Sequence, residues 1–91
     1  MIQETSRAAA WDTRLAIIGI IVEEREIAER INNLLSEYGQ YIKGRMGIPY
    51  DEKEVSVISV VVDAPMDVIS ALSGKLGALP GVSTKTVYSK K

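Results

Sequence analysis

The pattern of apolar and polar residues along the chain predicts four strands of two kinds. Residues 15–22 and 55–62 are apolar at nearly every position and rich in β-branched side chains, which is typical of central strands. Residues 41–48 and 82–89 mix polar and apolar positions, which fits strands at the edges of a sheet. Pro49 is expected to end the first of these edge strands.

Two segments between the predicted strands have the periodicity of amphipathic helices. Between residues 24 and 38, apolar side chains recur at intervals of three and four, and charged side chains occupy the other side. Residues 64–78 repeat this pattern, with Asp63 as the expected N-cap and Pro65 in the first turn. The predicted order is therefore strand, helix, strand, strand, helix, strand.

This order, with apolar first and third strands, predicts an α+β fold, the ferredoxin-like βαββαβ sandwich. Its antiparallel sheet has the strand order 4-1-3-2, which places the two apolar strands in the centre. Right-handed crossovers put both helices on one face of the sheet and leave the opposite face bare.

The bare face should carry every second side chain of the two central strands. If Ile18, Ile20, Ile58 and Val60 point toward the helices, the other face is lined by Ile17, Ile21, Val57 and Val61, with Gly19 and Ser59. An apolar surface of this kind usually marks an interface. We therefore expect a homo-oligomer, a dimer or a tetramer, that packs through Ile17, Ile21, Val57 and Val61. Alternatively, the N-terminal segment with Trp11 covers this face within the same chain.

Composition limits the chemistry available to the chain. With 91 residues it is expected to hold one domain, residues 14–91, preceded by a flexible leader, residues 1–13. It contains no cysteine and no histidine, so disulfides, thiol nucleophiles, imidazole bases and the commonest transition-metal ligands are excluded. No recognisable nucleophile or acid–base pattern remains, and we expect neither catalysis nor a cofactor nor a metal site.

Charge and hydropathy indicate the compartment and the partners. A net charge of −1 and a sequence pI near 5.4 argue against autonomous binding of nucleic acid. No apolar run approaches the roughly 20 residues that span a bilayer, and the N-terminus lacks the apolar core of a signal peptide. We expect a cytoplasmic protein that does not bind membranes.

Three stretches of the sequence resemble a family of small proteins known as regulators of the iron-only hydrogenase system. They are Ile-Val-Glu-Glu-Arg at 21–25, Gly-Arg-Met-Gly-Ile-Pro-Tyr at 44–50, and residues 69–77 with Pro-Gly-Val at 80–82. The resemblance covers the chain from residue 15 onward. It implies a ferredoxin-like domain similar to ACT domains and to the effector-binding part of nickel-responsive transcription regulators. Such domains assemble as dimers or tetramers and bind small effectors at their interfaces.

Not every property of these relatives carries over. The nickel sites of those regulators are built from histidine and cysteine, which this chain lacks, so nickel sensing is not expected. Their DNA-binding module needs several tens of residues before the sensor domain, whereas residues 1–13 precede the first predicted strand here. The usual ACT glycine turn is replaced by Glu-Glu-Arg-Glu at 23–26, which argues against an amino-acid pocket at that turn.

Candidate ligand-binding residues gather at the end of the first edge strand. Arg45 provides a fork-shaped cation, Gly47 an open backbone and Tyr50 an aromatic ring, which together suit a small anionic ligand or a partner peptide. Alternatively, Lys43 and Arg45 only protect an edge strand against unwanted pairing.

Lys75 is the fourth candidate, because the C-terminal end of the chain is basic and could hold a small anion. Gly74-Lys75 does not complete a phosphate-binding loop, since Ile69 and Leu76 stand where that motif requires glycine and a hydroxyl residue. A solvated charged surface is the alternative.

These observations together predict an oligomeric, ACT-like regulatory module that binds a small ligand or a protein partner, associated through family resemblance with the iron-only hydrogenase system. A structural adaptor, which docks another protein without any ligand, is one alternative. A transcriptional regulator that acts on DNA directly or through a partner is the other.

Overall fold

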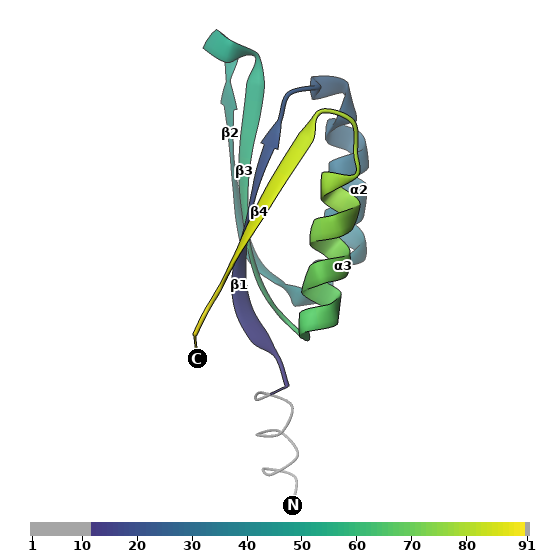
Figure 1. The fold of residues 1–91 in the computed structure, drawn as a ribbon. Helices are drawn as coiled ribbons and strands as arrows, with labels where there is room; N and C mark the ends of the chain where they lie inside the picture. Colours follow the sequence, from purple (N-terminus) through teal and green to yellow (C-terminus); the bar gives the residue numbers. More distant parts are fainter. Residues whose placement is uncertain (1–11, 91) are drawn as a thin grey trace, which may run out of the picture.

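The computed structural model describes residues 12–90 and holds six main elements (Figure 1). They are β1 (Arg14–Val22), α2 (Ala28–Glu37), β2 (Ile42–Tyr50), β3 (Val55–Ala64), α3 (Met66–Gly77) and β4 (Val82–Tyr88). Short 3₁₀ turns at Arg25–Ile27, Gly39–Tyr41 and Asp51–Lys53 connect them. The predicted order of strands and helices is confirmed. Trp11 and most of the predicted leader lie outside the described residues.

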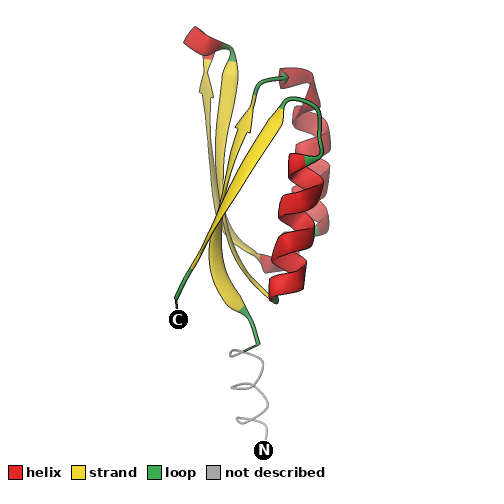
Figure 2. Cartoon of the chain, in the orientation of Figure 1, coloured by secondary structure: helices red, strands yellow, loops and turns green. Residues whose placement is uncertain are grey.

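The four strands form one antiparallel sheet in the order β2-β3-β1-β4, the reverse listing of the predicted 4-1-3-2. Both helices lie on the same face of the sheet, and the opposite face is left open (Figure 2). The predicted ferredoxin-like fold class is therefore confirmed. The two apolar strands are central because their helix-facing side chains fill the core.

The core lies between the sheet and the two helices. Alternate residues of the central strands point into it, and Ile18, Ile20 and Val60 are at most 1 % exposed. From the helices, Ile31, Leu72 and Leu76 complete the same cluster. Full burial of such side chains contributes about 1.5–3 kcal/mol each. This arrangement fixes which side chains of β1 and β3 are left for the open face.

Two local predictions were wrong, and strand pairing explains both. Pro49 does not end β2 but pairs with Ser56 inside it, which an edge strand tolerates because one side of its backbone has no neighbouring strand. Asp63 is not a helix cap, because β3 continues to Ala64 in register with β1. Pro65 occupies the N-cap position of α3 instead, without a side-chain cap.

Candidate functional site

The open face of the sheet carries eight of the nine large apolar side chains that are exposed in the described part of the chain. They are Leu15, Ile17 and Ile21 of β1, Met46, Ile48 and Tyr50 of β2, Val57 of β3 and Val87 of β4. The ninth, Met66, begins α3 on the other side of the molecule. Their exposed fractions on the open face range from 40 to 67 %. We call this surface the open sheet face.

Strand register arranges this face in rows across the sheet. Ile17 lies between Val61 and Val87, and Ile21 lies between Val57 and Ser83. The four predicted interface residues, Ile17, Ile21, Val57 and Val61, thus share one surface. The sequence-based prediction missed Leu15, which the alternation along β1 would have included. It also missed the apolar residues of β2 and β4, whose place on this face depends on strand register.

One row of the open sheet face differs from its neighbours. Gly19 lies between Ser59 and Lys85, and Met46 pairs with Ser59 on the far side. We call these four residues the Gly19 row. It places a bare backbone, a hydroxyl and an ammonium between the apolar row of Ile17 and the row of Ile21, which is apolar except for Ser83.

A pocket of about 280 Å³ lies between β2 and the start of α2, on the helical side of the sheet. Arg45 and Gly47 both line it, so two of the predicted ligand residues meet there. Its lining combines polar and apolar groups: Val22, Arg25, Ala28, Ile31, Asn32, Arg45, Gly47, Ile48, Pro49, Ser56 and Ile58. We call it the strand–helix pocket.

Both arginines of this pocket are held by hydrogen bonds. Arg45 Nη2 donates to Asn32 Oδ1 at 2.9 Å. Arg25 Nη2 forms an ion pair with Asp51 Oδ1 at 2.9 Å and donates a hydrogen bond to the carbonyl oxygen of Val55 at 3.3 Å. The guanidinium groups are therefore positioned at the pocket before any ligand arrives. Arg25 and Asn32 could not be predicted from the pattern of β2, because they lie in the 3₁₀ turn before α2 and in α2 itself.

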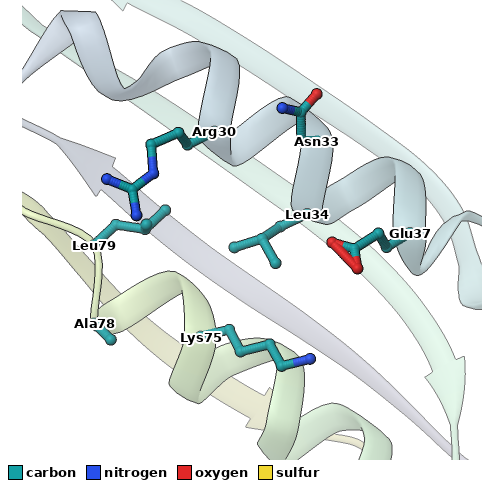
Figure 3. Close-up of a pocket in the computed structure, with 7 residues that line it drawn as sticks. All are labelled: Arg30, Asn33, Leu34, Glu37, Lys75, Ala78 and Leu79. Atoms are coloured by element: carbon teal, nitrogen blue, oxygen red, sulfur yellow. The ribbon is translucent and has the colours of Figure 1, made fainter.

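Tyr50 and Lys75 lie outside the strand–helix pocket that Arg45 and Gly47 line. Tyr50 pairs with Val55 and belongs to the open sheet face, on the opposite side of β2 from Arg45. Lys75 lines a separate groove of about 450 Å³ between α2 and α3, together with Arg30, Asn33, Leu34, Glu37, Ala78 and Leu79 (Figure 3). The four predicted ligand residues thus fall in three places.

Lys75 contacts Tyr38 at the groove between the helices. Its Nζ donates a hydrogen bond to the Tyr38 hydroxyl at 2.9 Å and lies 5.2 Å from the centre of that ring. The hydrogen bond to Tyr38 raises the pKa of Lys75, and the negative charge of Glu37 adds to the increase. In Figure 3, Leu34 points from α2 toward α3 between Arg30 and Glu37.

Residues 12–90 lack two features that would point to other functions. These residues contain no cluster of three or more acidic, histidine or cysteine side chains that could hold a metal ion. None of their helices combines the length and the apolar character needed to cross a membrane.

Comparisons with known proteins give a family and a fold. The model of the TM1266-like family, described as "Iron-only hydrogenase system regulator, putative", matches residues 14–86. The chain is similar to the structure of the uncharacterized protein TM1266 from Thermotoga maritima, with 43 % identity and a TM-score of 0.81. That match covers 86 % of this chain and 99 % of the other.

A more distant similarity shows the fold alone. The chain matches a formyltetrahydrofolate deformylase from Pseudomonas putida KT2440 with 14 % identity and a TM-score of 0.59. The match covers 80 % of this chain but only 28 % of the deformylase. A search of curated proteins found no match.

Proposed function

The chain belongs to the TM1266-like family of iron-only hydrogenase system regulators, and we propose that it acts there as a homo-oligomeric, ligand-responsive module. The family description is that of a regulator rather than an enzyme. The observation that carries the proposal is the open sheet face, where eight large apolar side chains lie at least 40 % exposed. A surface of this kind is rarely left in water by a small protein.

The size and shape of the open sheet face suit a second copy of the chain. Four strands spaced about 4.8 Å apart, each some nine residues long at about 3.3 Å per residue, give an area on the order of 500 Å². A specific protein interface buries at least about 1,000 Å² in total, or about 500 Å² from each partner, so this face reaches the lower end of the range. Two sheets stack face to face about 10 Å apart, and a two-fold contact covers both apolar faces at once. A dimer that packs sheet against sheet is the smallest assembly that removes this apolar surface from water.

The strand–helix pocket is the proposed site for the ligand. Its two positioned guanidinium groups favour a carboxylate or a phosphate, and its aliphatic side chains favour an apolar body on the same molecule. Because the pocket lies on the helical side of the sheet, a ligand there leaves the open sheet face free for assembly.

The assembly is tested by a pair of substitutions matched in exposure. Ile17 on the open sheet face and Met66 at the start of α3 are 46 and 45 % exposed. We expect Ile17→Asp to reduce the mass measured by light scattering to the 10.0 kDa of one chain, because a charge cannot be buried between two apolar sheets. Met66→Asp should keep the mass of the wild-type assembly. Equal masses for the two variants would reject the sheet interface.

The ligand site is tested by a thermal-shift panel of metabolites that carry a carboxylate or a phosphate on an apolar body. A ligand that binds the native state raises the melting temperature. We expect a hit in the wild-type protein and in Lys43→Ala, whose side chain does not line the pocket, and a much smaller shift in Arg45→Ala. A panel without any hit would favour the adaptor alternative over a ligand-binding module.

A further inference from the structure

Gly19 stands in a central strand where nothing in the described fold requires glycine. Its pairing with Ser59 and with Lys85 is regular, and its φ is not positive. A Cβ at this position would meet only the carbonyl oxygen of Lys85 at 3.8 Å, an ordinary contact. Glycine inside a strand weakens it, and it often marks a place where a ligand or another backbone approaches closely. Gly19 therefore has a cost to the fold, and residues 12–90 of one chain show no benefit from it.

The neighbours of Gly19 supply groups that bind anions. Lys85 is exposed, Ser59 is half-buried, and residues 12–90 provide neither side chain with a hydrogen bond or an ion pair. The four strands contain a single acid, Asp63, which pairs with Leu15 at the far end of the face. The Gly19 row thus concentrates a cation and a hydroxyl on a face whose remaining side chains are mostly apolar.

Pairing of two sheets would leave Lys85 without a counter-charge. The Gly19 row crosses the middle of the face, so a two-fold axis through its centre places the row of one copy over the row of the other. With the axis parallel to the strands, Lys85 faces Met46 of the second copy. With the axis perpendicular to them, Lys85 faces Lys85 of the second copy. In neither arrangement do the described strands place a carboxylate near Lys85, and enclosing an ammonium without one is costly.

We propose that the Gly19 row binds a small oxyanion, a carboxylate or phosphate group, between two copies of the chain. The Lys85 ammonium supplies the charge, the Ser59 hydroxyl donates a hydrogen bond, and Gly19 leaves room above the backbone of β1. The inference rests on the proposed assembly through the sheet, because the second copy closes the site. Since the anion binds only the assembled form, it strengthens the assembly. The site lies on the opposite face of the sheet from the strand–helix pocket.

The test compares sodium phosphate, sodium acetate and sodium chloride at matched ionic strength and pH. Sedimentation gives the association constant, and a thermal scan gives the melting temperature. In the wild-type protein, phosphate or acetate should raise both relative to chloride, and the more effective of the two identifies the preferred group. Lys53→Met, which removes an exposed lysine from the β2–β3 turn, should respond like the wild type. If the association constant and the melting temperature were the same in chloride, phosphate and acetate, the proposal would be overturned.

Two variants locate the effect on the Gly19 row. Lys85→Met keeps the length of the side chain and removes its charge, and it should bind the effective anion at least about ten-fold more weakly. Gly19→Ala should remain folded, with an equal or higher melting temperature in chloride, while its response to the anion falls. If either variant responded to the effective anion as strongly as the wild type, the site would be rejected.

The outcomes separate this inference from the proposed function. An oligomeric wild-type protein without a specific response to phosphate or acetate would reject the anion site alone. A wild-type mass of 10.0 kDa in all three salts would reject the assembly, and with it a site closed by a second copy.

Discussion

Gly81 is the residue whose backbone conformation the fold needs most directly. Its φ of +70° lies in the left-handed region, and a Cβ there would lie 2.8 Å from Glu24 Cβ and 3.1 Å from Glu24 N. Its carbonyl oxygen accepts a hydrogen bond from the Glu23 backbone N–H at 2.7 Å. Gly81 thus joins the segment after β1 to the turn before β4.

Gly81→Ala should lower the free energy of unfolding by about 1–3 kcal/mol, because the new side chain opposes the positive φ and collides with Glu24. Urea denaturation at fixed protein concentration measures the effect. Gly74→Ala in α3 is the control, since its Cβ meets nothing within 4 Å, and it should instead gain about 0.5–1 kcal/mol. Similar effects of the two substitutions would contradict this role of Gly81.

The contact between Lys75 and Tyr38 predicts a proton-binding effect. Tyr38→Phe removes the hydrogen bond that raises the pKa of Lys75, so this pKa should fall back toward 10.5. Because the folded protein holds the Lys75 proton more tightly than the unfolded chain, the contact stabilises the fold below pH 10.5. This contribution is lost as the pH rises through the raised pKa. An NMR titration of the lysine side chains measures this pKa, and Tyr41→Phe is the control that should keep the wild-type value. A wild-type pKa of Lys75 in Tyr38→Phe as well would show that Tyr38 does not cause the increase.

The candidate ligand residues show how far single positions can be predicted. Arg45 and Gly47 are two residues apart on one strand, so alternation places them on the same face, and both line the strand–helix pocket. Tyr50 is five residues from Arg45, an odd spacing that puts it on the opposite face. The expectation that Pro49 ends the strand concealed this parity. Lys75 lies on α3, and the spacing of residues in the sequence does not show which neighbouring element forms a groove with this helix.

At the scale of elements, the contrast between apolar and polar strands was enough to predict the sheet order. Residues 15–22 and 55–62 had to be central because both of their faces are apolar. The ends of elements were less predictable, because the local signals of Pro49 and Asp63 compete with strand pairing that extends past both. Where hydrogen-bonded pairing with the neighbouring strand continues past such a residue, the pairing outweighs the residue's own structural preference.

The turn between β2 and β3 holds Glu54 in the left-handed conformation, with φ 56°. Glu54→Gly should raise the free energy of unfolding by about 0.5–1 kcal/mol, since glycine adopts this conformation without a steric penalty. Glu52→Gly in the same turn has no positive φ to relieve and should be neutral or destabilising. Chemical denaturation of both variants provides the comparison. A loss of stability in Glu54→Gly would mean that its side chain contributes more than the backbone strain costs.

For the molecule as a whole, residues 12–90 form two α-helices and a sheet with two apolar faces. The helices cover the face that carries Ile18, Ile20 and Val60, and the face that carries Ile17, Ile21 and Val57 stays open in the described residues (Figure 2). Sequence alternation predicted this surface but could not give its full extent. The contributions of β2 and β4 depend on strand register, which only the folded structure fixes.

Sedimentation equilibrium of the unmodified protein at micromolar concentration shows whether the open sheet face is buried between copies of the chain. Burial of the open sheet face between copies predicts a mass of at least twice the 10.0 kDa of one chain. The association should be largely insensitive to sodium chloride, because apolar contacts rather than ion pairs hold the faces together. A single species of 10.0 kDa across the concentration range would mean that the open sheet face is not an interface between copies.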